Sequence, residues 1–584
     1  MLPSKYLENK KLTGFIVAGI IFIAFVLRVY GINSGLPHLP LHIDEPQMIE
    51  NAMEIGEGLN PRTLGWPGTS YMFILSFLYA VYFIISNIGN LLSNLIQRDP
   101  VGLTGIAENF YIFFYRDPSN WYIISRFVTV LFGTATIYVT YLCSRKLYGT
   151  TVGIVASFLL TFTQLHTAFS HHALSDVPMT FFVMLAFLYC YYLYKYRKTK
   201  HFIMAGLFSG LAIATKFNAG IMILTIFVAH LLSQRQAPFK WKNVLPDRKL
   251  LLTYGFLVLG FYIGCPYIVV QLAIVLKEVM LGTIGPRVGG DSLIRGMRFV
   301  AANLRVGMGS TLLLLSAAGI LYSLWRHTRE DILTLSFPII YLLNLINSTA
   351  FYPRYFMPVL PFLAILGARV LVDAIDKIPL RETFRPIAGL LAVFLIMIIP
   401  FVKVIGYERK LSRQDTRLLA KQWIEANVPS GSEVALHNNV VPLAKSKATL
   451  QKELSIFSDT ETAIQKKYKS MRGPEAEYPY VVFSNLFLND EQIFIKQRKY
   501  ALKDPEYPRI NYDIVNFSEH PVSLFLVAYD DIMEEIRNGS SLDILASDSE
   551  IEELGEPVKV FAPSHAFKGP TIRIYQLNPE LKLS

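Results

Sequence analysis

Long apolar runs separated by short basic segments dominate the first 406 residues of the chain. The first run, Gly14 to Val29, is long enough to cross a bilayer as a helix. Lys5, Lys10 and Lys11 precede it. Because basic flanks stay in the cytoplasm, we expect a cytoplasmic N-terminus and place the residues after Val29 at the outer face of the membrane.

The same alternation of apolar run and basic loop continues to Ile405, and it predicts about eleven spans in all. Every short basic loop then falls on one side, and the clearest of these loops is Lys195–His201. The predicted later spans are Trp121–Cys143, Thr151–Ala168, Val177–Tyr194, Phe202–Thr215, Ala219–Leu232, Leu250–Val270, Val306–Leu324, Ile332–Ile346, Phe356–Leu371 and Ile387–Ile405.

Three further segments are expected on the outer side without crossing the membrane. Apolar residues at helical spacing within Gln47–Gly58 predict an amphipathic helix lying on the membrane surface. Tyr71–Ile96 is long enough to span, but the direction of the next span puts both of its ends outside. We therefore expect a re-entrant or juxtamembrane helix there. Gln271–Asn303 is expected to be an outer loop.

The composition of the chain changes after Gly406. Gln414–Asn427 has the pattern of an amphipathic helix, and another helix is expected at Asp530–Asn538. Alternating strands and helices predict a small α/β domain. We expect a membrane domain at 1–406, with a first outer loop at 31–120, and an extracytoplasmic domain at 407–584. The expected strands are Val434–Leu436, Tyr480–Phe483, Leu524–Ala528 and Thr571–Tyr575.

The composition agrees with a polytopic helical membrane protein that carries a soluble domain. Of 584 residues, 52% are hydrophobic and only 17% are charged, whereas soluble domains have about a quarter of their residues charged. The net charge of +11 comes from basic residues in the short loops, which indicates topology and lipid-surface attraction rather than nucleic-acid binding. The three cysteines show neither metal spacing nor a disulfide framework.

Acidic side chains at the outer ends of the predicted spans are few. Asp44 and Glu45 follow the first span, and Asp176 begins another beside His171 and His172. A carboxylate at this level can act as a general base that takes a proton from an acceptor hydroxyl. A simpler interpretation is also open, in which Asp44-Glu45-Pro46 starts a surface helix and Asp176 caps one.

Cations stand at the same outer ends and can hold a phosphate group. Lys216 lies at the end of an otherwise apolar helix, and Arg126 lies near the start of another. Arg354 and Tyr355 open a later span. Lys216 could instead extend to the interface, and Arg354 could be an anchor in the aromatic belt. Acids and cations together at this face suit a reaction that displaces a lipid phosphate.

In their order and sidedness, several stretches resemble those of the C-type (GT-C) glycosyltransferases, in particular the superfamily of protein O-mannosyltransferases and lipid A aminoarabinose transferases. The resemblance covers most of the chain, although no single motif is specific. One departure is Gly65-Trp66-Pro67-Gly68, where many relatives have a Pro-Pro-type helix start. The matching stretches are His42–Glu45, Trp66–Gly68, Ser125–Phe127, Arg145–Gly149, Ser170–Pro178, Gly206–Lys216, Pro353–Pro358, Thr416–Gly431 and Lys568–Leu577.

The resemblance implies an inverting glycosyltransferase in the plasma membrane. Its donor would be a polyprenyl-phosphate sugar, and its acceptor would be a protein, lipid or glycan at the outer face. Asp44 would be the base, with Glu45 and Asp176 as its companions. The candidate ligands of the donor phosphate would be Lys216, Arg354, Tyr355 and Arg126.

A divalent metal ion is the cofactor that these residue types could bind. The carboxylates of Asp44, Glu45 and Asp176 could join His171 and His172 in a carboxylate–imidazole site. Adjacent histidines seldom chelate one ion on a helix, however, which favours an auxiliary interfacial role for this pair. The leaving lipid phosphate carries about two negative charges, which lysine and arginine can neutralise directly. We therefore predict transfer without a metal or another cofactor.

Two other classes of function remain open at this stage. A transporter or flippase for a lipid-linked substrate would explain the membrane body, but it predicts polar or broken helices at mid-membrane depth, which are sparse in this sequence. A non-catalytic envelope assembly factor would use the outer domain for binding. Pattern alone does not identify the sugar or the acceptor, because specificity depends on the shape of a pocket.

Overall fold

The computed structural model describes residues 9–37, 39–42, 44–55, 69–89, 110, 113–114, 117–234, 247–267, 292–346, 352–379, 381, 384–428, 433–436, 441, 443, 481–484, 524–529, 557–564, 566–568 and 572–577. The chain divides into two compact units. The first unit holds Met1–Ser34, Pro40–Ile88 and Ser119–Leu411, and the second holds Gly35–Leu39, Gly89–Pro118 and Ser412–Ser584.

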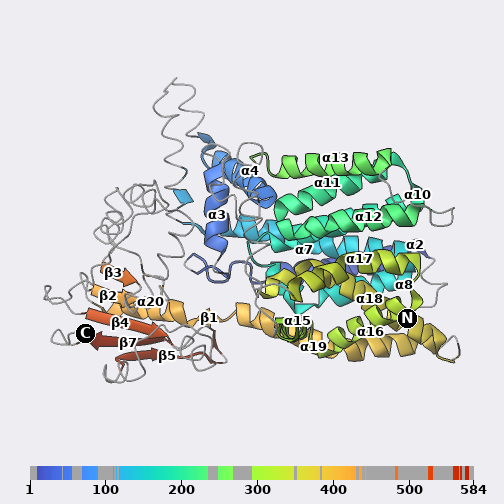
Figure 1. The fold of residues 1–584 in the computed structure, drawn as a ribbon. Coiled ribbons are helices and arrows are strands. Elements are labelled where there is room, and N and C mark those ends of the chain that lie inside the picture. The colour runs from blue at the N-terminus through green and yellow to red at the C-terminus, as the bar shows by residue number, and fades with distance from the viewer. Residues whose placement is uncertain are drawn as a thin grey trace. The chain divides into compact units, whose positions relative to one another are not determined.

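The first unit is built from helices (Figure 1). Two short 3-10 helices, η2 (Phe217–Ile221) and η4 (Pro353–Val359), precede α12 and α18 directly. The α-helices are α2 (Lys10–Val29), α3 (Glu45–Glu54), α4 (Thr69–Ser86), α7 (Ser119–Tyr148), α8 (Thr150–Thr161), α9 (Gln164–Phe169), α10 (Asp176–Tyr196), α11 (Thr199–Thr215), α12 (Met222–Ser233), α13 (Arg248–Gly264), α15 (Ser292–Met308), α16 (Ser310–Arg326), α17 (Arg329–Ile346), α18 (Leu360–Lys377) and α19 (Arg385–Leu411).

Among the described residues, six segments are long and apolar enough to cross a membrane: α2, α4, α7, α10, η4 with α18, and α19. Three shorter apolar helices, α8, η2 with α12, and α16, accompany them. The polytopic helical architecture predicted from the sequence is therefore confirmed. The exact number of spans stays a prediction.

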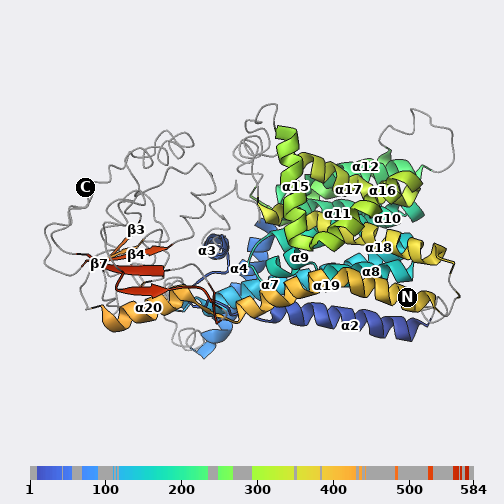
Figure 2. The ribbon, with the colours of Figure 1, turned by 90° about the horizontal axis from the view of Figure 1, so that it is seen from below.

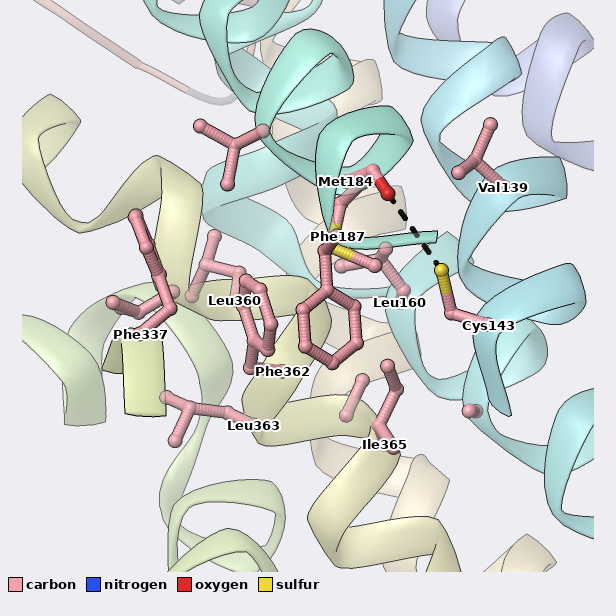
Figure 3. Packing of buried hydrophobic residues seen from close by; sticks show 14 of the residues in the cluster. Val139, Cys143, Leu160, Met184, Phe187, Phe337, Leu360, Phe362, Leu363 and Ile365 are labelled. Atoms are coloured by element: carbon pink, nitrogen blue, oxygen red, sulfur yellow. Dashed lines mark hydrogen bonds between the residues drawn. The ribbon is translucent and has the colours of Figure 1, made fainter. Parts of the chain in front are cut away.

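Apolar side chains from α7, α8, α10, α17 and α18 pack together in the part of the core that Figure 3 shows. The Phe362 ring of α18 lies 4.8 Å from that of Phe187 and 5.2 Å from that of Phe337, measured between centroids. Cys143 donates its S–H to the carbonyl of Met184 at 3.7 Å. Because lipid tails are as apolar as these side chains, close packing rather than burial from water favours the helix contacts.

Glycines bring α11 and α13 together, and Figure 1 shows these helices side by side. A Cβ atom at Gly206 would collide with the carbonyl oxygen of Thr253, and one at Gly210 would collide with that of Leu257. Gly260 of α13 faces the Leu207 carbonyl in the same way. Small residues at four-residue spacing allow helix backbones to approach closely in membranes.

The predicted span Thr151–Ala168 is wrong as a single helix. The helix breaks at Phe162–Thr163, so that α8 ends at Thr161 and α9 starts at Gln164. Hydroxyl groups compensate for the break, because Thr163 donates to Leu159 O at 3.0 Å and Thr167 donates to Thr161 O at 3.1 Å. Side-chain hydroxyls that satisfy backbone carbonyls make such interruptions tolerable in an apolar environment.

The predicted outer loop Gln271–Asn303 is also corrected in its last part, which is helical from Ser292 onwards in α15. Val300, Leu304 and Met308 are buried at four-residue spacing, which is the signature of an amphipathic helix. This helix continues into the start of the predicted span Val306–Leu324. The chain turns at Gly309, whose φ of +86° favours glycine, and α16 begins after it.

The expected juxtamembrane helix Tyr71–Ile96 corresponds to α4, which packs on α7 and α11. The hydroxyl of Tyr71 donates to Ser125 O at 2.8 Å, and Thr69 donates to Ala214 O at 2.8 Å. The re-entrant path itself stays a prediction, because α4 is also among the segments able to span.

The second unit is an α/β domain, as predicted. Its five-stranded sheet has the order β3-β2-β4-β7-β5, in which β2 is parallel to β3 and β4, and β7 is antiparallel to β4 and β5. All four expected strands are present, whereas the expected helix at 530–538 lies outside the described residues. The elements are β1 (Gln414–Asp415), α20 (Thr416–Asn427), β2 (Glu433–Leu436), β3 (Val481–Ser484), β4 (Leu524–Tyr529), β5 (Lys559–Phe561), β6 (Phe567–Lys568) and β7 (Ile572–Leu577).

The sheet is stabilised by packing against α20. Ile572 and Ile574 alternate along β7 and are both fully buried. They share an apolar cluster with Ala420 and Ile424, which lie four residues apart on α20. This pairing of a strand face with a helix face is the ordinary way in which a small α/β domain forms its core.

Candidate active site

Asp44 and Glu45 stand at the start of α3, where Pro46 occupies the first turn. Neighbouring helix positions differ in direction by about 100°, so the two acids face different surroundings. Glu45 is completely buried, whereas the Asp44 side chain keeps about 20% of its surface exposed. The position of Glu45 therefore suits a structural role, and the position of Asp44 suits contact with a ligand.

Glu45 accepts four hydrogen bonds. Two come from the guanidinium of Arg126, at 3.1 Å from Nε and 2.8 Å from Nη2. The backbone N–H groups of Leu41 and Ala173 donate the others, at 2.7 and 2.8 Å. A bidentate arginine together with two amides satisfies a buried carboxylate almost completely. This carboxylate therefore joins the loop before α3, the helix α7 and the turn before α10.

Arg126 is equally engaged. Its Nη1 donates to Ile32 O at 2.8 Å and to Ser34 O at 3.1 Å, in addition to the two bonds to Glu45. Four of its five N–H groups therefore have protein acceptors. The side chain is fully buried, so the arrangement favours a positioning role over the predicted contact with a donor phosphate.

Asp44 pairs with a cation that is distant in the sequence. Its Oδ2 forms an ion pair with Nη1 of Arg354, which lies in η4. The same Nη1 lies 3.2 Å from Nε2 of His42, and the Asp44 N–H lies 3.1 Å from Nδ1 of that ring. A neutral imidazole accepts at only one nitrogen, so His42 can satisfy one of these donors at a time.

The charge state of His42 follows from its surroundings. Burial and the neighbouring Arg354 lower the pKa of His42 below its usual value, against the opposing effect of Asp44. The ring is therefore neutral at pH 7 and can accept a proton or a hydrogen bond beside Asp44.

Asp176 and Lys216 form a second pair of opposite charges. Lys216 Nζ donates to Asp176 Oδ1 at 2.6 Å, and both side chains are buried. Asp176 lies in the first turn of α10 after the cap residue Ser175, and Lys216 follows the last residue of α11. The simpler interpretations from the sequence, a capping aspartate and a lysine extended to the interface, do not describe these positions.

The ring of Tyr355 connects the two pairs. Lys216 Nζ lies 4.9 Å from its centroid, and Arg354 Cζ lies 5.8 Å from it. A second ring, that of Tyr352, lies 4.8 Å from Arg354 Cζ. Contacts of cations with aromatic faces stabilise both charges without neutralising them. The structure thus brings together Asp44, Asp176, Lys216, Arg354 and Tyr355 in one site.

His171 faces away from that site. It is fully buried, and its ring nitrogens lie 2.9 Å from the carbonyl oxygens of Thr167 and Tyr30. Its Nε2 is also 3.5 Å from Glu408 Oε2. These contacts connect the ends of α2, α9 and α19, which is a structural role.

His172 faces the site. Its ring lies 5.6 Å from that of His42, and its Nε2 lies 3.4 Å from the hydroxyl of Tyr407. Burial lowers the pKa of His172 well below the usual value, so this ring is neutral. Among the described residues, no group of three His, Cys, Asp or Glu side chains could hold a metal ion.

Sequence reasoning missed His42 and Tyr352 as members of the site. A signal for each was present, since His42 stands two residues before Asp44 and Tyr352 stands two residues before Arg354. Local spacing did not distinguish them from the many other aromatic residues of the chain.

Comparison with known proteins bears on the family resemblance and on the fold. Residues 117–276 match the family model described as dolichyl-phosphate-mannose-protein mannosyltransferase. The matched range includes Arg126, Asp176 and Lys216. No curated protein matches the sequence.

Solved structures resemble the chain, including the three that follow. ArnT from Cupriavidus metallidurans in the apo state is 12% identical over 97% of this chain and 98% of its own, with a TM-score of 0.50. ArnT bound to undecaprenyl phosphate gives the same identity and coverage with a TM-score of 0.48. The Archaeoglobus fulgidus oligosaccharyltransferase tethered with an acceptor peptide is 13% identical over 90% of this chain and 70% of its own, with a TM-score of 0.48. The shared fold with apo ArnT and the family match support the predicted resemblance to the GT-C superfamily.

Proposed function

We propose that this protein with a GT-C fold is a membrane glycosyltransferase that uses a polyprenyl-phosphate sugar as its donor. The observation that carries the proposal is the meeting of two carboxylate–cation pairs, Asp44 with Arg354 and Asp176 with Lys216, at the ring of Tyr355. Such a site has a base for the acceptor and cations for the leaving phosphate. The matched family model describes a transferase of the same kind.

Asp44 acts as the general base because it is the exposed acid of the site. Its carboxylate takes the proton of an acceptor hydroxyl as the hydroxyl oxygen attacks the anomeric carbon of the sugar. The bond between that carbon and the phosphate oxygen of the donor breaks at the same time, with inversion. The proton ends on Asp44, and the electron pair of the broken bond ends on the lipid phosphate.

Lys216 and Arg354 stabilise the charge that develops on the departing phosphate. Both cations are paired with a carboxylate in the free site. The donor phosphate competes with Asp44 for Arg354, whereas the ammonium of Lys216 has three N–H donors and can bind the phosphate and Asp176 together. Binding of the donor then releases Asp44 from Arg354, which leaves its carboxylate available as a base. Asp176 keeps Lys216 in place, and the hydroxyl of Tyr355 can add a hydrogen bond to the phosphate.

The buried Glu45–Arg126 pair positions Asp44, the residue next to Glu45. It fixes the first turn of α3 against α7 and the 173 backbone, so the neighbouring Asp44 carboxylate is presented in one direction. In this proposal His172 is an auxiliary residue beside His42, and His171 supports the surrounding helices. Because two cations balance a phosphate of about two negative charges, we propose that transfer needs no metal or other cofactor.

The reaction takes place at the outer face of the plasma membrane, according to the distribution of basic loops. The N-terminus is cytoplasmic and the C-terminal domain extracytoplasmic in this proposal. The partners are the lipid-linked donor, the surrounding lipid, and a protein, lipid or glycan acceptor.

The test is transfer of a radiolabelled sugar from a polyprenyl-phosphate donor by the purified protein in detergent, with and without a strong chelator. We expect transfer that survives chelation and falls by about 10²- to 10⁴-fold in Asp44→Asn, the usual loss when a general base is removed. The matched control is Asp376→Asn, which changes an exposed carboxylate at the end of α18. Unchanged activity in Asp44→Asn would remove Asp44 from the mechanism, and movement of intact donor between leaflets without transfer would indicate a flippase.

A further inference from the structure

A groove lies between α2 and α7, apart from the candidate active site. It has a volume of about 1090 Å³, just above the usual range of about 300–1,000 Å³ for sites that hold small molecules. α2 packs against α7 and α8, and Figure 2 shows its full length. On α2 the small residues Gly14 and Ala18 form the hollow, and Phe22 and Phe25 continue it past the middle of the helix. A Cβ atom at Gly14 would meet no other atom within 4 Å.

One end of the groove is cationic. Lys10 and Arg145 line it there, and neither has an ion-pair partner among the described residues. Thr150 and Thr151 line the same end, at the start of α8. The cap residue Gly149 supplies no side-chain hydrogen bond to the first turn of α8, and that turn contains no acid. Backbone N–H groups at a helix N-terminus favour an anion, as do the two cations beside them.

The rest of the groove is lined mainly by apolar and aromatic side chains, with Thr13 and Thr134 among them, and contains no acidic residue. Tyr138 and Tyr141 line the α7 side opposite Val17 and Ile21 of α2. The groove therefore combines a place for a negative headgroup with a wall that suits a hydrocarbon chain. Its long direction follows α2 and α7, which are both able to span a membrane.

The cationic end is far from the candidate active site. Arg126 and Arg145 stand at opposite ends of α7 and are 19 residues apart, or about 28 Å at the rise of an α-helix. The basic residues at this end also belong to the side that the loop distribution assigns to the cytoplasm. A donor whose phosphate binds at Lys216 and Arg354 cannot place the same phosphate at Lys10 and Arg145.

We propose that this groove binds an anionic glycerophospholipid of the cytoplasmic leaflet. The lipid phosphate lies between Lys10 and Arg145 at the first turn of α8, and one acyl chain lies along Gly14, Ala18 and Phe22. Basic residues near an anionic leaflet contribute about 1 kcal/mol each. The two cations therefore give an anionic lipid an advantage of about 30-fold over a zwitterionic lipid with the same chains.

The test is native mass spectrometry of the purified full-length chain, titrated with phosphatidylglycerol or phosphatidylcholine of identical acyl chains. Two variants remove the site: Lys10→Gln/Arg145→Gln removes the charges, and Gly14→Leu fills the hollow. Each has a matched control outside the groove. Lys11→Gln/Lys146→Gln removes the same charge from neighbouring positions, and Gly19→Leu adds the same side chain where a Cβ atom would also meet nothing.

We expect the unaltered protein to prefer phosphatidylglycerol by about 30-fold. The preference should disappear in Lys10→Gln/Arg145→Gln, binding should fall in Gly14→Leu, and both controls should bind as the unaltered protein does. Equal binding of the two lipids, or binding that the groove variants leave unchanged, would overturn the proposal. Displacement of phosphatidylglycerol by an equal amount of undecaprenyl phosphate would also overturn it, because the groove would then belong to a polyprenyl lipid.

Discussion

Arg354 and Asp44 form an ion pair although they are 310 positions apart in the sequence. The pair connects the beginning of α3 with η4, two segments that lie far apart along the sequence. His42 contacts the same guanidinium, so the arginine stands between a carboxylate and an imidazole. The arrangement makes Arg354 the residue that both restrains the proposed base and can release it.

Removing either proposed phosphate ligand should weaken donor binding more than it weakens folding. We expect Lys216→Gln and Arg354→Gln each to raise the KM for the donor about tenfold or more, since a charge-assisted hydrogen bond contributes about 1.5–3 kcal/mol. Arg354→Lys should recover part of this loss, because it keeps the charge without the planar fork. Steady-state kinetics at varied donor concentration measure the effect. An unchanged KM in both glutamine variants would show that the phosphate binds elsewhere.

Breaking the Glu45–Arg126 pair should destabilise the protein. Glu45→Gln leaves Arg126 as a buried cation without its counter-ion, which costs about 3–5 kcal/mol. Replacing both partners, as in Glu45→Met/Arg126→Leu, should cost less than the single change, because no isolated charge remains. Thermal unfolding in detergent, followed by tryptophan fluorescence, makes the comparison. A double variant less stable than either single variant would contradict this account of the pair.

Stability should decrease as the pH falls below about 6.5, and His172 should account for part of the decrease. Its folded-state pKa lies well below the value of an unfolded histidine, so the unfolded chain binds the additional proton first. Unfolding is therefore favoured as the pH falls from about 6.5 toward the folded-state pKa, by up to about 1.4 kcal/mol per pH unit. His172→Phe should flatten this part of the profile, whereas the exposed His327 can be changed to Gln as a control. An identical slope in His172→Phe would exclude this histidine as a cause.

The orientation can be tested by labelling single cysteines from outside the cell. Gln422→Cys on α20 should react with a membrane-impermeant maleimide, and Lys198→Cys in the basic loop before α11 should not. Both positions are exposed, and the natural Cys143, Cys190 and Cys265 are buried, so background labelling should be low. The reverse pattern would put the active site at the cytoplasmic face.

The sequence predicted most helices and strands because their residues repeat with a clear period. Breaks within apolar segments escaped prediction: nothing in the local pattern marks Thr163 as a helix interruption, since its hydroxyl compensates from within the same segment. Gly309 did not stand out either, because glycine is common in membrane helices. Apolarity predicts where a chain can be buried, but not where its backbone changes direction.

For the site, the sequence identified the charged residues but not their pairing. Asp44 and Glu45 look equivalent as neighbours, and only the packing of α3 on α7 gives them different surroundings. The same holds for Arg126. Its charge suggested a contact with a phosphate group, whereas in the structure its buried guanidinium pairs with Glu45. The paired residues lie 40, 81 and 310 positions apart in the chain, and one sequence offers no direct measure of such contacts.

The glycine contact between α11 and α13 has a consequence for mutation in this protein. Gly206 and Gly210 leave no room for even one methyl group against the α13 backbone. A change to alanine, which would stabilise an isolated helix, must here push two helices apart. Lys216 stands at the end of α11, so displacement of this helix would also move the cation away from Asp176. A substitution at an uncharged position outside the candidate site could therefore abolish activity although every residue of the site is unchanged.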